Sequence, residues 1–178
     1  MEKETNFLKQ YFKNKIEILD IFSGSGCMGI YANKILNSNI TFSDIKNTFL
    51  KQIKLNCMIN NIHNYTIIKS NIFKKINKQY NLILANPPYV PKKDLIQKSV
   101  LQYEPSIALF GKGKDGLGII SIFLKNLNSH LKNNGICILE FHPNQKEKIQ
   151  DILDQSNFKY IFKKDQYLRD RYVLIFKK

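Results

Sequence analysis

The chain has few cysteines, few histidines and almost no arginine. Its three cysteines show neither a paired spacing nor a matching group of histidines, which disfavours both a disulfide framework and a zinc site. The histidines share no ligand spacing either, so we expect them to be structural or exposed, and we expect no bound metal. The compartment is expected to be reducing. The cysteines are Cys27, Cys57 and Cys137, and the histidines are His63, His130 and His142.

Long hydrophobic runs are also absent. No run approaches the ~20 apolar residues of a membrane span, and the opening segment lacks the apolar centre of a signal peptide. At 178 residues the chain has the size of one domain, which buries roughly two thirds of its unfolded surface. We therefore expect one domain over residues 1–178, without membrane contact. Its expected location is the cytoplasm, or an organelle matrix if the protein is encoded or imported there.

Acidic residues are scarce, and the net charge is +14. Clustered basic residues attract the phosphates of nucleic acid. Here only Arg169 and Arg171 are arginines, and the lysines are spread along a chain that is also rich in Asn and Ile. This distribution indicates a compositional bias and solvated faces, so a dedicated nucleic-acid surface is the less favoured interpretation.

The amino-terminal third predicts a strand, a glycine loop and a helix in direct succession. A short helix is expected within residues 1–15, and residues 16–22 form an apolar run typical of a buried strand. The loop from Gly24 to Gly29 follows at once and leads into a helix that ends near Leu36. Glycines allow a sharp turn close to a ligand, and a helix amino terminus offers N–H groups to a carboxylate or phosphate.

Asp44 follows a second short strand, residues 40–43, and stands 20 positions after Gly24. This matches the ~20 positions that separate the glycine loop from the ribose-binding acid in nucleotide-binding folds. Asp44 alone fits a helix N-cap equally well, but the glycine loop upstream favours nucleoside binding. The combination fits either a nicotinamide dinucleotide or S-adenosylmethionine.

The remainder of the chain continues to alternate helices and strands, which predicts an α/β fold. The helical periodicity of residues 47–60 places Cys57 and Met58 in the core. Residues 90–116 form a long connection of the kind that serves as a lid or binding loop. The helix that begins at Leu117 is expected to stop at Asn134-Gly135. The other expected elements are strands over 65–69, 80–85, 136–140, 160–163 and 172–176, and a helix over 145–155.

Asn86-Pro87-Pro88-Tyr89 stands at the carboxyl end of the strand 80–85, where open α/β sheets place their chemistry. The prolines lack N–H groups and have a fixed φ, so they hold the Asn86 amide and the neighbouring carbonyls in one geometry. Such a site suits a planar NH2 group, whose N–H groups are accepted by the Asn86 side chain and a main-chain carbonyl while Tyr89 lies against it. An isolated Asn-Pro-Pro is equally well an ordinary turn.

This motif resembles the signature of S-adenosylmethionine-dependent methyltransferases that modify planar NH2 groups, which selects methyl transfer over hydride transfer. Together with other stretches it resembles the HemK-type family of protein-(glutamine-N5) methyltransferases. The other stretches are Leu19-Asp20-Ile21 with Gly24-Ser25-Gly26-Cys27, Tyr103-Glu104-Pro105 through Ala108-Leu109-Phe110 to Asp115-Gly116-Leu117, and Arg169-Asp170-Arg171.

The resemblance implies a Rossmann-like class I methyltransferase: a mostly parallel seven-stranded sheet, helices on both faces and an antiparallel strand near the C-terminus. It implies methyl transfer from S-adenosylmethionine, with S-adenosylhomocysteine as product, to the glutamine N5 of the Gly-Gly-Gln motif in class-1 peptide-chain release factors. The lysine-rich surface would be a contact for ribosome or RNA. The implied catalytic residues are Asn86, Pro87, Pro88 and Tyr89. The implied cofactor-binding residues are Asp20, Gly24, Ser25, Gly26, Gly29, Asp44, Asn71, Ile72 and Asn86.

Several positions depart from the family pattern. Asn71 stands where many nucleoside-binding methyltransferases carry an acid for the adenine amino group, the loop 111–116 is one residue longer than usual, and His142-Pro143 replaces a common glycine. The family's helical amino-terminal domain is expected to be absent. Two alternatives therefore stay open. They are an adenine-N6 methyltransferase acting on RNA or DNA, and a catalytically silent methyltransferase-fold scaffold on a ribonucleoprotein.

Charged residues near the C-terminal strand are expected to form ordinary ion pairs or to support the structure. Arg169 and Arg171 are expected to pair with Asp165 or Asp170 at the sheet edge. Glu140, at the end of the strand 136–140, either supports the site or is a structural carboxylate.

Overall fold

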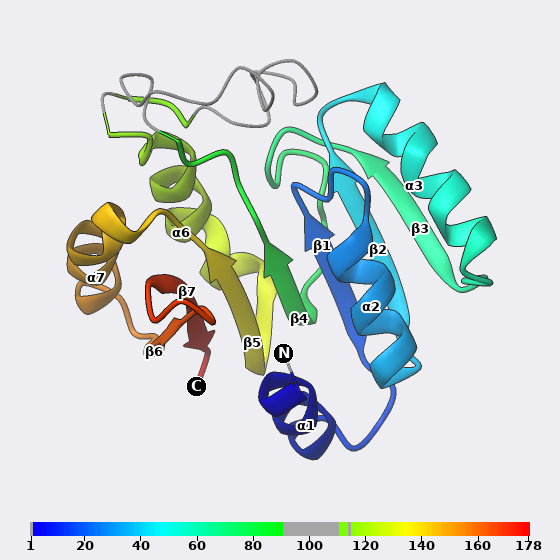
Figure 1. Ribbon diagram of the computed structural model, residues 1–178, viewed down its shortest axis with the longest axis horizontal. Helices are drawn as coiled ribbons and strands as arrows, with labels where there is room; N and C mark the ends of the chain where they lie inside the picture. Colours follow the sequence, from blue (N-terminus) through cyan, green and yellow to red (C-terminus); the bar gives the residue numbers. More distant parts are fainter. Residues whose placement is uncertain (1, 91–110, 114) are drawn as a thin grey trace.

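A single sheet forms the centre of the molecule, with helices on both of its faces. The computed structural model describes residues 2–90, 111–113 and 115–178, and Figure 1 shows their arrangement. The strands are β1 (Glu17–Ile21), β2 (Asn39–Asp44), β3 (Tyr65–Lys69), β4 (Tyr80–Ala85), β5 (Leu131–Glu140), β6 (Lys159–Lys164) and β7 (Asp170–Phe176). The helices are α1 (Glu2–Tyr11), α2 (Cys27–Leu36), α3 (Asn47–Ile59), α6 (Gly118–His130) and α7 (Lys146–Asp154), with a 3-10 turn η1 (Pro143–Gln145).

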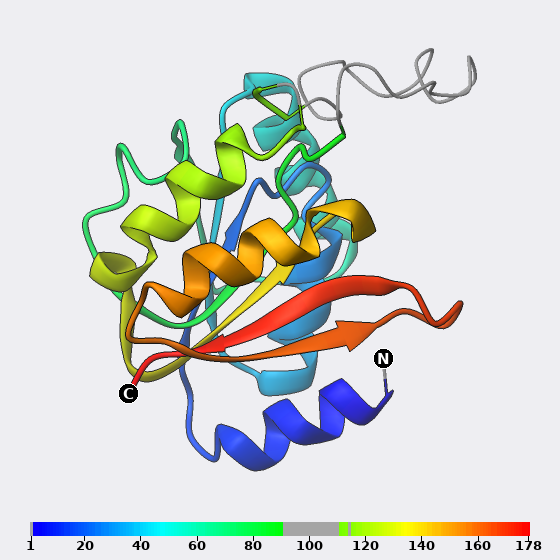
Figure 2. The ribbon, with the colours of Figure 1, turned by 90° about the vertical axis from the view of Figure 1, so that its left-hand side faces the viewer.

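The described strands lie in the order β3-β2-β1-β4-β5-β7-β6. Neighbouring strands are parallel from β3 to β5, whereas β7 runs antiparallel to both β5 and β6. In Figure 2, β6 and β7 form a long hairpin in orange and red. This arrangement confirms the predicted seven-stranded, mostly parallel sheet with an antiparallel strand near the C-terminus.

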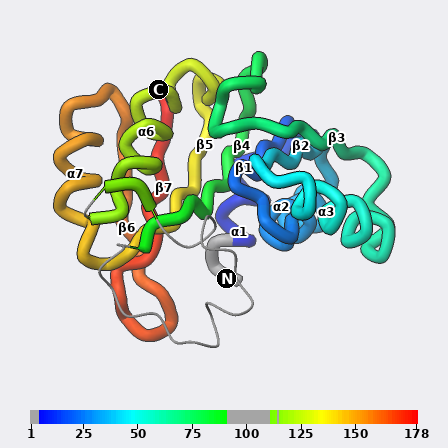
Figure 3. The backbone as a smooth tube through the Cα atoms, turned by 90° about the horizontal axis from the view of Figure 1, so that it is seen from above, coloured from blue at the N-terminus to red at the C-terminus, as the bar shows by residue number. Residues whose placement is uncertain are grey.

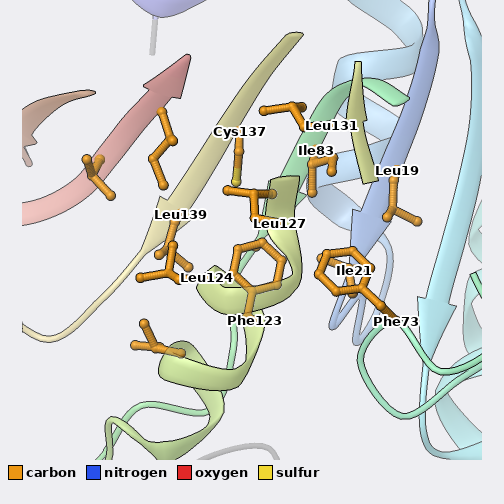
Figure 4. Packing of buried hydrophobic residues seen from close by; sticks show 14 of the residues in the cluster. Leu19, Ile21, Phe73, Ile83, Phe123, Leu124, Leu127, Leu131, Cys137 and Leu139 are labelled. Atoms are coloured by element: carbon orange, nitrogen blue, oxygen red, sulfur yellow. The ribbon is translucent and has the colours of Figure 1, made fainter. Parts of the chain in front are cut away.

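Two apolar layers hold the helices to the sheet. Along β1, Ile18 faces the layer formed with α1, α2 and α3, and Leu19 faces the layer formed with α6 and α7; Figures 1 and 3 show these helices on opposite faces. Figure 4 shows Phe123 and Leu127 of α6 packed over the strands. Because both faces are covered, the central strands are apolar on both sides. Burial of each such Leu or Phe side chain contributes about 1.5–3 kcal/mol.

The order of the strands reverses between β1 and β4, since the chain passes from β1 to β2 and β3 and then returns to the other side of β1. At the carboxyl edge, Ile21 of β1 pairs in register with Ser43 of β2 and with Ala85 of β4. The turns that follow these strands therefore meet beside one another. Such a reversal point is where open α/β sheets bind their ligands.

The end of α6 differs from the prediction. The helix ends at His130, and β5 begins at Leu131 rather than at Ile136. Leu131 is fully buried and pairs with Tyr80 of β4, so burial draws the chain into the sheet before Asn134 is reached. Asn134 has a φ of 57°, and its N–H bonds to the Lys177 carbonyl beyond β7. Asn134-Gly135 is therefore a bend within β5.

Helix α3 also differs in one residue. Ile53 and Cys57 are fully buried, as expected from residues four positions apart on one helix face. Met58 is 67 % exposed, so the prediction that it belongs to the core is wrong. It follows Cys57 by one position and is turned about 100° around the helix axis.

Among the helices of the described ranges, none combines the length and the apolar character that a membrane span requires.

Candidate active site

A cavity of about 690 Å³ opens at the carboxyl edge of the sheet. This size lies within the roughly 300–1,000 Å³ of small-molecule sites. The turns after β1, β2, β3 and β4 contribute to its lining, and α6 closes one side. The lining residues from these turns and strand ends include Phe22, Gly24, Ser43, Asp44, Ser70, Asn71, Ile72, Asn86 and Pro88, and those from α6 are Ile119, Ile122, Asn126 and His130.

The predicted cofactor residues fall into two groups. Those that line the cavity are Gly24, Asp44, Asn71, Ile72 and Asn86. The others, which are not among the lining residues of the described ranges, are Asp20, Ser25, Gly26 and Gly29. Their role in cofactor binding stays a prediction, and the structure places Asp20 and Gly29 underneath the loop.

Asp20 supports the glycine loop from below. Its side chain is buried, and Oδ2 accepts a hydrogen bond of 2.9 Å from the Gly29 N–H. A Cβ on Gly29 would lie 2.5 Å from Phe42 and 2.7 Å from Asp20 Oδ2, closer than any real contact. Glycine at position 29 therefore lets the first turn of α2 approach the carboxyl group and the aromatic ring.

Burial raises the pKa of the Asp20 carboxyl to about 8, the Gly29 N–H opposes this shift, and the nearby Asp44 charge adds to it. The folded protein therefore holds the Asp20 proton more tightly than the unfolded chain does. This contribution to stability is present below the ordinary pKa of about 4 and is lost as the pH rises through about 8.

We expect Asp20→Asn to remove this pH dependence. The free energy of unfolding is measured in urea for both proteins from pH 5 to pH 8. As the pH rises, the value for the parent should fall relative to that of the variant by up to about 1.4 kcal/mol per pH unit. Asp151→Asn, an exposed position on α7, serves as the control. A parent-minus-variant difference that stays constant across this range would contradict the assignment.

Asp44 joins the second strand to the glycine loop. Its Oδ2 accepts from the Gly24 N–H at 3.0 Å, and its Oδ1 accepts from the Lys46 N–H at 3.1 Å. The N-cap of α3 is Lys46, so the alternative of Asp44 as a helix N-cap is wrong. Each carboxylate oxygen keeps a further acceptor position, and the residue lines the cavity, where the hydroxyls of a ribose would be accepted.

Three residues of the cavity lining have a strained backbone or an unpaired polar group. Phe22 and Ile72 have φ values of 60° and 51°, a left-handed backbone that costs non-glycine residues about 1–3 kcal/mol and is concentrated at functional sites. Ser43 Oγ is buried without a hydrogen-bond partner among the described residues. A polar group of a bound nucleoside would satisfy this hydroxyl, and Asp44, the next residue, lines the same cavity.

The Asn-Pro-Pro-Tyr motif is divided between the cavity and the layer behind it. Asn86 is exposed and lines the cavity with Pro88, whereas Pro87 is buried. No hydrogen bond between described residues involves the Asn86 side chain, so its amide is open to a ligand. Tyr89 is not among the lining residues, and its hydroxyl donates to Glu140 Oε1 at 2.9 Å. Burial and the Glu140 charge raise the pKa of Tyr89, which keeps the phenol neutral.

Glu140 also binds Arg171 across the sheet. Arg171 Nε lies 3.4 Å from Glu140 Oε1, and its guanidinium lies 5.5 Å from the centre of the Tyr89 ring. The prediction that Arg171 pairs with Asp165 or Asp170 is therefore wrong. The antiparallel register pairs Glu140 with Tyr172 and brings the preceding arginine to the carboxylate. Arg169 pairs with Asp165 at 2.9 Å, as predicted.

Helix α6 supplies cavity residues that the sequence analysis missed. Ile119, Ile122, Asn126 and His130 line the cavity and recur at helical spacing, so a second stripe beside the buried one was the available signal. His130 is structural, as predicted, because its ring stacks on Phe73 at 4.0 Å. It also forms part of the cavity wall. The predicted lid or binding loop at 90–116 lies for the most part outside the described residues.

Residues 1–103 match the family described as "Methyltransferase small domain". The chain belongs to this family. Among similar proteins, a release factor glutamine methyltransferase from Borreliella burgdorferi is 33 % identical over 82 % of this chain and 51 % of its own length. Another from Fusobacterium nucleatum is 36 % identical over 90 % of this chain and 47 % of its own length. The chain thus spans about half the length of these relatives.

The fold is shared with a crystal structure of a Streptococcus mutans protein in complex with SAH. That protein aligns with a TM-score of 0.68 at 14 % identity, over 99 % of this chain and 97 % of its own. The family match, the strand order and this likeness confirm the predicted class I methyltransferase fold. The relatives' names likewise confirm the resemblance to release factor glutamine methyltransferases.

Proposed function

We propose that this chain transfers a methyl group from S-adenosylmethionine to the side-chain N5 of the glutamine in the Gly-Gly-Gln motif of a class-1 peptide-chain release factor. The observation that carries the proposal is the Asn86 side chain, which is exposed and open to a ligand at a cavity of nucleoside size. The names of the two relatives support this choice of substrate.

The cofactor would occupy the cavity. Asp44 would accept the ribose hydroxyls, the Gly24 turn would approach the amino-acid part, and Ile72 would pack against the adenine. Asn71, which also lines the cavity, would offer an amide oxygen to the adenine amino group in place of the acid that many nucleoside-binding methyltransferases carry. When bound, S-adenosylmethionine supplies a methyl group on a sulfonium, whose departure leaves a neutral thioether.

Asn86 would hold the substrate amide. Its side-chain carbonyl accepts one N–H of the glutamine, and a main-chain carbonyl of Asn86 or Pro87 accepts the other, which directs the nitrogen lone pair toward the methyl group. Each neutral hydrogen bond contributes only about 1 kcal/mol, so direction matters more than affinity. Alignment of the reacting atoms can supply several of the ~7–11 kcal/mol available from positioning.

No strong base is required for this reaction. The amide nitrogen forms its bond to the methyl carbon as the carbon–sulfur bond breaks, and the extra proton on the alkylated amide is acidic enough to pass to water.

The location of the protein follows from its proposed substrate. A protein that modifies release factors acts where translation takes place, in the cytoplasm or an organelle matrix. The lysine-rich surface would then face the ribosome or RNA through screened electrostatic attraction.

The test is transfer of label from S-adenosylmethionine to three acceptors: an intact release factor, a copy whose motif glutamine is replaced by alanine, and bulk RNA. We expect label on the intact factor alone. Label on RNA would favour an adenine-N6 methyltransferase instead. Failure to bind cofactor in calorimetry, with no label on any acceptor, would favour a silent scaffold and would overturn the proposed activity of this chain.

A further inference from the structure

Gln145, the last residue of η1, is a buried polar side chain next to the Asn-Pro-Pro-Tyr motif. It is 2 % exposed, and Nε2 donates at 2.8 Å to both the Tyr89 carbonyl and the Asp115 carbonyl. Its Oε1 accepts from the His142 N–H at 3.0 Å. The amide oxygen therefore takes part in the capping of η1, and both amide N–H groups are used on two carbonyls outside its own element.

Those two carbonyls belong to segments that are far apart in sequence and in contact in the fold. A Cβ on Gly116 would lie 2.3 Å from the Tyr89 carbonyl oxygen, and Gly116 has a φ of 74°. The Gly111 N–H donates to the Val90 carbonyl at 3.1 Å. Gln145 thus lies at the junction where the chain leaves the motif and where it returns toward α6.

Tyr89 is held at its other end as well. Its hydroxyl donates to Glu140 Oε1 at 2.9 Å, and Glu140 lies only a few residues before Gln145, at the end of β5. The same segment therefore fixes the phenol and the main-chain carbonyl of one residue. With that carbonyl directed to Gln145, the acceptors left for a substrate amide are those of Asn86 and the prolines.

We propose that Gln145 is a positioning residue, which fixes the Tyr89 peptide and thereby the direction in which Asn86 presents its amide. This inference rests on the proposed function. A primary amide is required at position 145 because two carbonyls need donors while the His142 N–H needs an acceptor. A carboxylate offers no donor, and asparagine is one methylene too short to reach the same three groups.

Gln145→Glu tests the proposal because it changes the donors and hardly changes the shape. The ionised carboxylate would face two carbonyl oxygens and displace them, whereas the protonated form can donate to one of them. At alkaline pH we expect kcat to fall about 10- to 100-fold, with the KM for cofactor nearly unchanged because Gln145 does not line the cavity. At acidic pH part of the loss should be recovered.

Gln150→Glu is the matched control, since Gln150 is exposed on α7 and undergoes the same change of charge. The proposal predicts an additional ionisation in the pH profile of kcat for Gln145→Glu that is missing from Gln150→Glu. A purely structural Gln145 would lower stability without adding this ionisation. Equal profiles for the two variants, with the parent active, would overturn the proposal.

Hydrogen exchange tests the positioning role of Gln145 even if the parent transfers no methyl group. The Gly111 N–H, which bonds to Val90, should exchange about tenfold faster in Gln145→Glu than in Gln150→Glu at the same alkaline pH. Amides in the centre of β4 should exchange alike in both variants. Equal exchange of Gly111 in the two variants would refute the positioning role, whereas an inactive parent would refute the proposed function instead.

Discussion

Asn86→Ala is expected to lower kcat for methyl transfer by about 100- to 1,000-fold while cofactor affinity stays within about threefold of the parent. The substitution removes the side-chain carbonyl that would orient the substrate amide, and the adjacent prolines keep the main chain in place. Initial rates with labelled S-adenosylmethionine at saturation, together with calorimetric titration of S-adenosylhomocysteine, measure the two quantities separately.

Asn77→Ala is the control for this experiment. Asn77 is exposed and precedes β4 at the opposite edge of the sheet, so its loss should leave both kcat and cofactor affinity unchanged. Turnover by Asn86→Ala at the parent rate, under saturating cofactor, would remove Asn86 from the reaction. A fall of cofactor affinity with kcat unchanged at saturating cofactor would assign Asn86 to cofactor binding alone.

Asp44→Ala should have the complementary effect. Loss of the carboxylate removes the acceptor for ribose and also releases the Gly24 N–H, which bonds to Asp44 Oδ2 at 3.0 Å. Hydrogen bonds to charged groups contribute about 1.5–3 kcal/mol, so we expect the Kd for S-adenosylhomocysteine to rise about 10- to 100-fold. Calorimetric titration measures it directly, and saturating cofactor should restore much of the turnover.

Asp151→Ala, on the exposed face of α7, controls for the loss of one negative charge from a basic protein. It should leave the Kd for S-adenosylhomocysteine unchanged. If Asp44→Ala also left this Kd unchanged, the ribose would have to bind elsewhere, and the assignment of the cavity to the cofactor would be wrong. A variant that fails to fold would be recognised by its unfolding curve, and Asp44→Asn, which keeps one acceptor oxygen, would replace it.

Sequence patterns were sufficient for the parts of the fold that depend on local order. The apolar runs of β1 and β4 and the residues that follow them predicted which side chains reach the carboxyl edge. Asn86, Asp44 and Gly24 accordingly line the cavity. These positions could be predicted because a parallel sheet brings the ends of its strands together whatever the lateral details of packing.

Contacts between distant segments could not be predicted in the same way. The partner of Arg171 depends on the register of β7 against β5, and the start of β5 depends on the burial of Leu131 against β4. The role of Gln145 depends on the return of the chain at Asp115. Local periodicity does not encode these pairings, because each is decided by which strands become neighbours.

The structure also explains one departure of this chain from the family pattern. His142 stands where a glycine is common, yet its φ of −77° requires no glycine. Its Nδ1 accepts from the Asn144 N–H, and its own N–H donates to Gln145. The His142-Pro143 pair therefore begins η1 with its own cap and places Gln145 beside the motif.

We propose above that Asn86 and its neighbours present a glutamine amide to the methyl donor. Fragment-ion mass spectrometry of a release factor, after incubation with this chain and S-adenosylmethionine, tests it most directly. We expect a mass gain of one methylene, located on the side chain of the Gly-Gly-Gln glutamine and missing when Asn86→Ala replaces the parent. A methyl group on any other residue, or an unmodified factor beside methylated RNA, would contradict it.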